Sequence, residues 1–570
     1  MQGTCTEMGK PSDIERIKSA SRHLRGTLLE SLANPITGAL RVDDVQLLKF
    51  HGGYQQDDRD VREARRVAKL EPAYIFFVRL RLPGGVLTPR QWLAMDDTAR
   101  RFGTHGIRMT SRQTIQVHGI DKRNLRAAVQ NIHASGLDTI AACGDDNRNV
   151  VAAVNPLLSA VHAQIHEQAQ ALSLHLRPQS RAWFETWLGE PATDGSEPEP
   201  LLGDAYMPRK FKIGFAVPPE NDIDVYSQDV GLVAIIEDGQ LAGYNVLVGG
   251  GMGASHGDAK TYPRMASLIG FITPDQVTAL SVATLTIQRD HGDRSDRKHA
   301  RFKYTVDDKG LPWIKAEIER RAGFTLQRQR PFRFTQRGDR FGWREGDDGR
   351  WHLGLRIPFG RVHDDGKTTR QAGMREIAAL LAEHAPDAQI RLTPNQNAFI
   401  AGVPGELRAA IDAITAKHDL DLYRSETPLG LNVIACVAFP TCGLAMAESE
   451  RWMPHLVPKL QGLLDQHGLH DEPLDVRVSG CPNGCSRPYL AEIALIGKAP
   501  GRYNLMLAGD HRGQRMNAVY RENIDEPAIL TELDALFVRF AAEREGGEHF
   551  GDFCARTNVV TPPAEREVTP

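Results

Sequence analysis

The sequence contains two stretches that repeat each other, GIRMTSRQTIQVHGI at 106–120 and QIRLTPNQNAFIAGV at 389–403. A helical pattern follows each of them, KRNLRAAVQNIHASGL after the first and GELRAAIDAITAKHDL after the second. A shorter echo links GYNVLVGGG at 243–251 to RYNLMLAGD at 502–510. One structural unit used twice produces such internal similarity. We therefore expect an α+β molecule with two pseudo-equivalent halves, and a large ligand at the interface between them.

Length, charge and hydropathy narrow the class of protein. The chain has 570 residues, 41% of them hydrophobic, which suggests about three or four domains. A net charge of -3 argues against a nucleic-acid binder that works through bulk positive charge. No apolar stretch is long enough to span a membrane, and the N-terminus lacks the apolar core of a secretion signal. We therefore expect a cytoplasmic protein.

Local patterns predict the elements around the first repeat. Residues 74–82, YIFFVRLRL, have the composition of a strand, and PGG at 83–85 predicts a turn. Thr88 and Pro89 predict the start of a helix. A further strand is predicted over 107–118, with an apolar face and a polar face that alternate. The polar face carries Arg108, Thr110, Arg112, Thr114, Gln116 and His118. For one strand taken alone, an ordinary solvated face explains this pattern.

Four of the seven cysteines form two short pairs, ACVAFPTCG at 435–443 and GCPNGCSRP at 480–488. Their C-x5-C and C-x3-C spacings fit a zinc ribbon poorly, and the tight cysteine run of bacterial ferredoxins is absent. Small, turn-forming neighbours favour an iron–sulfur cluster, because glycines let backbone N–H groups approach the sulfides. A zinc knot and four buried free thiols remain as alternatives.

The two cysteine motifs, ACVAFPTCGLAMAE and VSGCPNGCSRPYLAEI, resemble the signature of the sulfite/nitrite reductase family. The resemblance extends almost end to end, through KFHGGYQQDDRD, RLRLPGGV, DDNRNV, YMPRKFK, DRSDRK and GKAPGRYNLMLAGD. It implies that Cys436, Cys442, Cys481 and Cys485 bind a [4Fe–4S] cluster, and that Cys485 also bridges to the iron of a siroheme. The implied fold has ferredoxin-like halves plus two α/β cofactor-binding domains around one siroheme/[4Fe–4S] centre.

The same resemblance implies a division into five parts. They are an N-terminal extension over 1–70, a ferredoxin-like half over 71–137, a siroheme- and substrate-binding domain over 138–325, a second ferredoxin-like half over 326–424, and a cluster-binding domain over 425–570.

The resemblance also assigns the polar strand face and several other residues to siroheme. A tetrapyrrole with eight carboxylates needs cationic and hydrogen-bonding partners. The residues placed there are Arg108, Thr110, Arg112, Gln116 and His118, with Arg301 and the neighbouring Lys303 as weaker candidates. In the second repeat Arg391 and Thr393 persist, but Asn397, Phe399 and Ala401 replace the later polar residues. We therefore expect one working cofactor site and one relic.

Four further cations are predicted to bind the substrate. By resemblance, Arg79, Arg148, Lys210 and Lys212 line the distal face of siroheme, where each taken alone is otherwise an ordinary exposed basic residue. Sulfite is a small oxyanion, and clustered cations attract it and stabilise charge on its oxygens. Crowded lysines have depressed pKa values and can also donate protons. Asn483 is predicted either to hydrogen-bond near the cluster sulfurs or to be an ordinary turn residue.

The resemblance implies the six-electron reduction of sulfite to sulfide for cysteine synthesis. The alternatives are a ferredoxin-dependent nitrite reductase and, in another class, a zinc-knotted binding module. GGGMG at 249–253 lacks the context of a dinucleotide loop, and no other stretch reads as an NADPH or flavin site. Electrons must then come from a partner, either a flavoprotein fed by NADPH or a ferredoxin, and residues 1–70 are the expected docking segment. Cys143 is predicted to be a buried thiol rather than one cross-linked to Tyr54.

Overall fold

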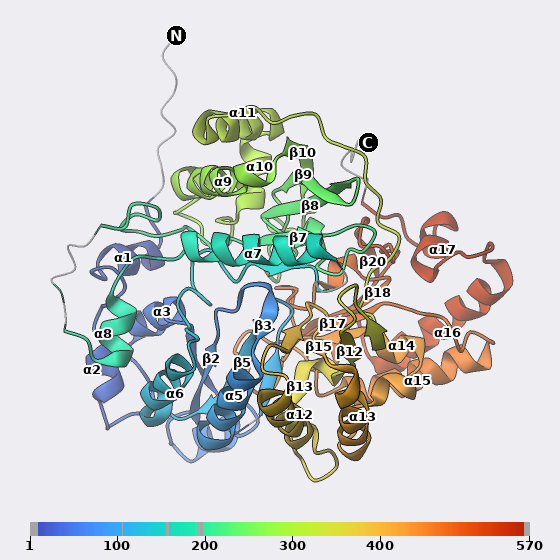
Figure 1. Cartoon of the computed structure of the whole chain (residues 1–570), viewed down its shortest axis with the longest axis horizontal. Helices are drawn as coiled ribbons and strands as arrows, with labels where there is room; N and C mark the ends of the chain where they lie inside the picture. The colour runs from blue at the N-terminus through green and yellow to red at the C-terminus, as the bar shows by residue number, and fades with distance from the viewer. Residues whose placement is uncertain (1–9, 105, 155–158, 192, 194–197, 564–570) are drawn as a thin grey trace.

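The computed structural model describes residues 10–104, 106–154, 159–191, 193 and 198–563. In this part of the chain four five-stranded sheets form the framework. Figure 1 shows the sheet of the first repeat beside that of the second, with one α/β sheet above them and the other to the right. The structure is α+β, as the sequence predicts.

Two of the sheets are built around the sequence repeats. They have the strand orders β1-β2-β5-β4-β13 and β11-β12-β15-β14-β3, so each half lends a short edge strand to the sheet of the other. This exchange interlocks the two halves. The strands of the first sheet are β1 (Gly53–Asp57), β2 (Tyr74–Arg79), β4 (Ile107–Met109), β5 (Ile115–Ile120) and β13 (Arg361–Val362); those of the second are β11 (Gly342–Glu345), β12 (Trp351–Leu355), β14 (Gln389–Leu392), β15 (Ala398–Val403) and β3 (Val86–Leu87).

Amphipathic helices pack on the two repeat sheets, and one hydrophobic core spans both halves. Thr88 caps the first of these helices and Pro89 begins it, as predicted; the Thr88 side chain accepts a hydrogen bond from the Gln91 N–H (3.2 Å). Trp92, in the first turn of this helix, is fully buried. The helices are α5 (Pro89–Phe102) and α6 (Lys122–Ala134) in the first half, and α12 (Arg370–His384) and α13 (Arg408–Lys417) in the second.

The other two sheets share one topology, with orders β10-β9-β8-β7-β6 and β20-β19-β18-β17-β16. In each, three parallel strands are followed by two antiparallel ones. The similar segments 243–251 and 502–510 lie on β9 and β19, which are equivalent strands of the two sheets. This equivalence explains their similarity in sequence. The strands are β6 (Val151–Ala152), β7 (Ile213–Ala216), β8 (Val230–Glu237), β9 (Gln240–Val248), β10 (Ser267–Ile272), β16 (Val433–Ala435), β17 (Val476–Ser479), β18 (Ile493–Ala499), β19 (Arg502–Leu507) and β20 (Ala518–Ile524).

Further helices flank these sheets or precede the first repeat. The former are α7 (Ala160–His175), α9 (Val277–His291), α10 (Phe302–Lys309), α11 (Leu311–Ala322), α14 (Pro428–Leu431), α15 (Met453–Gln466), α16 (Glu526–Glu543) and α17 (Phe550–Arg556). The latter are α1 (Asp13–Ser19), α2 (Leu28–Ala33), α3 (Val42–Phe50) and α4 (Arg62–Val67). Helix α8 (Ala182–Leu188) packs instead against α6 of the first repeat. None of the described helices combines the length and the apolar character needed to cross a membrane.

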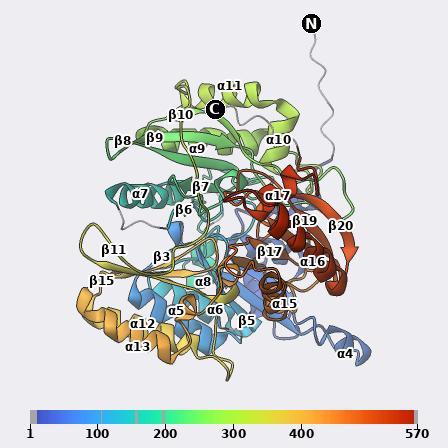
Figure 2. The ribbon, with the colours of Figure 1, turned by 90° about the vertical axis from the view of Figure 1, so that its right-hand side faces the viewer.

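The segment before residue 71 is largely part of the body of the protein. Lys18 on α1 is buried and donates to the Met207 carbonyl (2.7 Å), and β1 pairs with β2 in the first sheet. Helix α4 is different, because none of its residues is buried. It projects from the molecule in Figure 2.

The prediction of a single strand over 107–118 is wrong, because the chain turns back at its middle. β4 and β5 pair antiparallel, with Arg108 opposite Gln116, and the Thr110 N–H donates to the Thr114 carbonyl (2.9 Å). The turn contains no glycine, proline, asparagine or aspartate, and Ser111 alone is a weak turn signal; Gln113 adopts a positive φ of 52°. The hairpin keeps Arg108 and Gln116 together on one face.

Candidate active site

The two cysteine pairs lie on loops at one edge of the last sheet. The first cysteine loop, 436–442, follows β16, and the second cysteine loop, 481–485, follows β17. Because these strands are neighbours and parallel, their carboxyl ends lie side by side. The Gly480 N–H donates to Cys436 Sγ (3.2 Å), which joins the loops directly.

The four thiols share one electrostatic environment. They are not joined in disulfides. Burial, followed by the charges of the other thiols, raises the pKa of Cys442 and of Cys481 to about 12, and also raises that of Cys436. Deprotonation of such a set requires a cationic group among the thiols, which an iron–sulfur core supplies. Among the described residues, no three His, Cys, Asp or Glu side chains are placed to hold a metal ion. Four thiols from two adjacent loops are the donor chemistry of an iron–sulfur cluster.

Cys485 lies where three parts of the molecule meet. Its thiol side chain is exposed, while its carbonyl accepts a hydrogen bond from Ser111 Oγ (2.8 Å) in the hairpin turn of the first half. The neighbouring Pro482 carbonyl accepts the N–H of Ala254, from the segment after β9. The charge of Cys485 also acts on Lys210. An exposed thiol between these parts is placed to bind an additional group.

Three predicted cations, Arg148, Lys210 and Lys212, lie at one edge of the other α/β sheet, near Cys485. Arg148 precedes β6 and the two lysines precede β7, and these strands are parallel neighbours. Burial, followed by neighbouring cations, lowers the pKa of Lys210 and Lys212 well below the ordinary lysine value. Both keep partly exposed surface, and neither forms an ion pair with a carboxylate of the described residues. The site therefore presents uncompensated positive charge.

Arg79, Gln116 and His118 form a short network on the first sheet. Arg79 lies opposite Gln116 in the β2–β5 register. With its amide oriented by these contacts, Gln116 accepts from Arg79 Nη2 (2.5 Å) and donates to His118 Nε2 (3.3 Å). Arg79 Nη1 also contacts the sulfur of Cys143 (3.2 Å), a buried free thiol. Arg148 is anchored separately, through Nε to the Ala142 carbonyl (3.0 Å).

Three other predicted cations already have protein partners. Arg112 donates through Nη1 to Gln228 Oε1 (2.8 Å) and through Nε to the Asn149 carbonyl (3.1 Å), and burial, followed by Arg148, lowers its pKa to about 9. Arg301 pairs with Asp229 (3.1 Å).

Lys303 donates to the carbonyls of Gly251 (3.1 Å) and Gly253 (2.7 Å). Burial, followed by the charge of Arg301, lowers the Lys303 pKa to about 6. These side chains hold the glycine turn 249–253 and the cation cluster in place.

Arg108 lies apart from the substrate cations. Its guanidinium pairs with Glu450 (2.8 Å), just behind the first cysteine loop. Thr110 accepts the Arg112 N–H (3.2 Å) within the hairpin turn. Asn483 donates to Cys481 Sγ (3.6 Å), so its amide reaches a cluster-loop sulfur.

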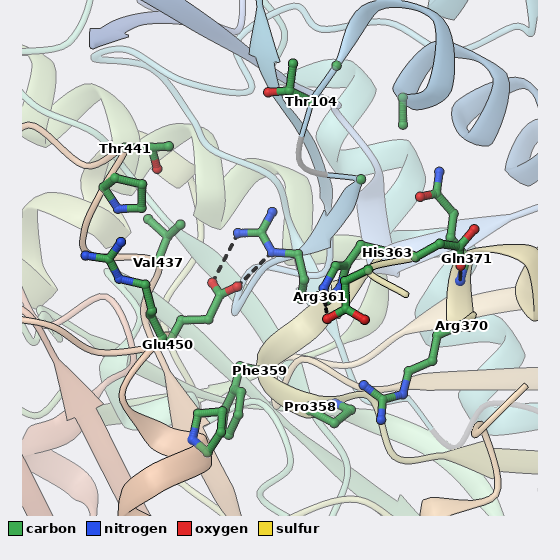
Figure 3. A pocket seen from close by; sticks show the side chains of 18 of the residues that line it. Thr104, Pro358, Phe359, Arg361, His363, Arg370, Gln371, Val437, Thr441 and Glu450 are labelled. Carbon is green, nitrogen blue, oxygen red and sulfur yellow. Dashed lines mark hydrogen bonds and ion pairs between the residues drawn. The ribbon is translucent and has the colours of Figure 1, made fainter. Parts of the chain in front are cut away.

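Sequence reasoning missed several residues of this site. Arg209, beside Lys210, has a pKa lowered to about 10, with burial the largest cause and Asp145 opposing it; its place in the basic run PRKFK was the available signal. Asp229 and Glu450, the partners of Arg301 and Arg108, carried no local signal because they are distant in the sequence. A pocket of about 720 Å³, drawn in Figure 3, borders Glu450 and the first cysteine loop.

The chain is similar to known proteins in sequence and in fold. The family model "Nitrite and sulphite reductase 4Fe-4S domain" matches residues 167–326, and "Nitrite/Sulfite reductase ferredoxin-like half domain" matches 68–135 and 344–418. The chain is 57% identical, over 97% of both chains, to a Xanthomonas oryzae protein named "Sulfite reductase [NADPH] hemoprotein beta-component". A Myxococcus xanthus protein of the same name is 55% identical over 97% of this chain and 98% of its own.

A solved structure shares the fold. The Mycobacterium tuberculosis NirA protein superimposes with a TM-score of 0.78, at 22% identity, over 96% of this chain and 97% of that one. The family models together match more than half of the residues, and the curated relatives match nearly the whole length. The resemblance seen in the cysteine motifs is therefore confirmed, and the chain belongs to the nitrite and sulfite reductase family.

Proposed function

We propose that this protein reduces sulfite to hydrogen sulfide in sulfate assimilation and cysteine biosynthesis, using a siroheme coupled to a [4Fe–4S] cluster. The relatives that match it over nearly the whole length are named as the hemoprotein component of NADPH sulfite reductase. The observation that carries the proposal is the meeting of Cys485 with the uncompensated lysines at one place. A redox centre and an anion site are thereby joined.

Cys436, Cys442, Cys481 and Cys485 would hold the cluster, and Cys485 would also hold siroheme. When bound, the two groups store and transfer the electrons of the reduction. Asn483 positions its amide on the Cys481 sulfur and so affects the electronic environment of the cluster. The siroheme carboxylates are met by the hairpin and its surroundings: Arg108, Thr110, Arg112, Gln116, His118 and Arg301.

Arg79, Arg148, Lys210 and Lys212 bind and orient the substrate anion. These four cationic side chains attract a dianionic oxyanion, and the bound anion compensates their positive charge. The lysines have strongly lowered pKa values, so an ammonium there releases its proton readily to a substrate oxygen. The arginines hold the oxygens through N–H donors. Binding and proton transfer are thereby divided between the two residue types.

Electrons are supplied by a partner, an NADPH-fed flavoprotein, in the cytoplasm. The exposed helix α4 follows Arg59, whose Nη1 donates to the carbonyls of Cys442 (3.1 Å) and Ala445 (2.7 Å) at the end of the first cysteine loop. Within the proposed extension 1–70, α4 is therefore the docking element. The remaining divisions stay as proposed: two ferredoxin-like halves at 71–137 and 326–424, and cofactor-binding domains at 138–325 and 425–570.

Steady-state turnover with chemically reduced viologen tests the reaction without the partner. We expect a clear preference for sulfite over nitrite in kcat/KM. A preference for nitrite would assign the protein to the other activity of its family. Docking is tested by capture of the flavoprotein with Arg62→Glu and Val67→Asp on α4, which we expect to abolish capture while leaving viologen turnover intact. Unchanged capture would exclude α4.

A further inference from the structure

Glu450 connects two arginines directly behind the first cysteine loop. Its carboxylate accepts from Arg108 Nε (2.8 Å) and from Arg361 Nε (2.7 Å). Arg108 lies on β4 and Arg361 on β13, which are paired strands from opposite halves of the molecule, with the two arginines opposite each other. Figure 3 shows the Arg361–Glu450 contact at the pocket wall. These three residues, here called the charge triplet, carry a net charge of one positive unit.

The charge triplet is bonded to both sides of Cys436. The Glu450 N–H donates to the Cys436 carbonyl (3.0 Å), and Arg108 Nη2 donates to the carbonyl of the preceding Ala435 (3.1 Å). The Cys436 N–H in turn donates to Ser449 Oγ (3.1 Å). The charges are therefore fixed in position relative to the Cys436 sulfur.

The site related to this one by the pseudo-two-fold symmetry provides an internal comparison. There β3 pairs with β14 as β13 pairs with β4, and the matching residues are Val86 and Arg391. Arg391 donates to Gln389 (2.9 Å) and forms no ion pair with a described carboxylate. The residue after β6, in the place of Cys436 after β16, is Ala153. The fold therefore forms without a charge triplet at the pseudo-symmetry-related site, and the triplet stands at the site that has the cysteines.

We propose that Glu450, with Arg108 and Arg361, sets the reduction potential of the iron–sulfur cluster bound through Cys436. This proposal rests on the proposed function. Reduction adds a negative charge to the cluster, so nearby positive charge favours the reduced form and negative charge opposes it. Glu450 cancels one of its two arginines, and its loss raises the potential. Loss of Arg361 leaves a neutral pair and lowers the potential.

The contacts of the charge triplet rank the two effects. Glu450 and Arg361 both border the water-accessible pocket, and each side chain is 14% exposed, so solvent weakens the fields of the two charges alike. Glu450 is the member whose own backbone N–H is bonded to the Cys436 carbonyl, which fixes its charge beside the cluster loop. We therefore expect Glu450→Gln to produce the larger shift.

Redox titration of the holoenzyme, followed by the paramagnetic signal of the reduced cluster, tests this proposal. We expect Glu450→Gln to favour cluster reduction by about tenfold, which is about +59 mV for one electron, and Arg361→Gln to shift the potential in the negative direction. Arg370→Gln is the matched control: it removes a positive charge from the same pocket, where Arg370 pairs with Asp419 instead. We expect no shift in this variant.

Failure of the proposed function and failure of the charge-triplet proposal give different results. Absence of iron and acid-labile sulfide from the wild-type protein would contradict the proposed function itself. A cluster present at full occupancy whose potential is the same in wild type, Glu450→Gln and Arg361→Gln would overturn the charge-triplet proposal alone. Shifts of equal sign in the two variants would also overturn it, because packing damage, unlike charge, does not change sign with the residue removed. If Glu450→Gln does not fold, Arg361→Gln and its control decide the question.

Discussion

Asp224 and Arg487 occupy equivalent positions in the two α/β sheets and form an ion pair with each other. Each precedes a single turn of 3-10 helix, Val225–Ser227 or Pro488–Leu490, in the left-handed conformation (φ 50° and 55°). The matching strands β8 and β18 follow at the same distance. The pair therefore links the pseudo-symmetric halves at corresponding points, two residues after Cys485 in the half that holds the cysteines.

Loss of the Asp224 carboxylate will strongly destabilise the protein. It is fully buried and pairs with Arg337 and Arg477 as well as Arg487, and these guanidiniums hold its pKa far below the usual range against the effect of burial. Asp224→Asn leaves buried cations uncompensated, at a cost of about 3–5 kcal/mol in unfolding free energy. Denaturant unfolding measures this loss. The surface pair Glu63–Arg66 supplies the control Glu63→Gln, for which a change comparable to that of Asp224→Asn would contradict the burial argument.

Asp222 makes the stability of the protein fall as the pH rises, because its pKa is raised whereas that of Asp224 is lowered. It stands in the place of Cys485 in the other half, and burial raises its pKa to about 7. An aspartate in the unfolded chain has a pKa of about 3.9, so the unfolded state loses its proton first. The contribution of Asp222 to stability is therefore complete below about pH 4 and is lost as the pH rises to about 7.

The variant Asp222→Asn removes this titration. Asp222 Oδ2 accepts the Val154 N–H (2.8 Å), and Oδ1 has no hydrogen-bond partner among the described residues, so an amide can keep the first contact. We expect the variant to gain stability relative to wild type with a slope of up to about 1.4 kcal/mol per pH unit between about pH 4 and 7, and a plateau above. Denaturant unfolding at several pH values measures it. A difference between the two proteins that stays constant with pH would contradict the assigned shift.

The sequence predicts the duplicated architecture because both repeats keep their apolar alternation, even where the polar face of the second has decayed to Phe399 and Ala401. The helix at Thr88 is equally readable, since capping is local. The hairpin at 107–118 is not, because its turn relies on Gln113 at positive φ rather than on glycine. Local residue preferences identify ordinary turns; a turn held by distant partners leaves no local pattern.

The cysteine loops are predictable for a similar reason: each lies within a few residues, and their facing arrangement follows from adjacent parallel strands. The balance of charge at the site is not predictable. Arg108 and Lys210 look alike in the sequence, yet Arg108 pairs with Glu450, whereas Lys210 has no acidic partner among the described residues. Such pairing is decided by tertiary contacts between residues far apart in the chain.

Lys210→Met will lower turnover far more than removal of an exposed lysine. Lys210 lies among Arg209, Arg301 and Arg148, so its loss removes both an anion contact and a proton donor. We expect kcat/KM for sulfite with a viologen donor to fall by about 10²–10³-fold. The control is Lys309→Met at an exposed position, for which we expect wild-type turnover. Wild-type kcat/KM in Lys210→Met would remove this residue from the substrate site.

Cys485→Ser will impair binding of the two cofactors without disturbing the fold. The Cys485 side chain is exposed and its backbone is held by Ser111, so replacing the sulfur leaves the packing intact while removing the proposed shared ligand. We expect iron and acid-labile sulfide to fall and the siroheme absorption to be lost or displaced, with unchanged far-ultraviolet circular dichroism. Cys554, buried in the C-terminal core, gives the control Cys554→Ser, which we expect to keep both cofactors at some cost in stability. Retention of both cofactors in Cys485→Ser with unaltered spectra would show that this thiol binds neither of them. The ligand shared by cluster and siroheme would then have to be one of the other three cysteines.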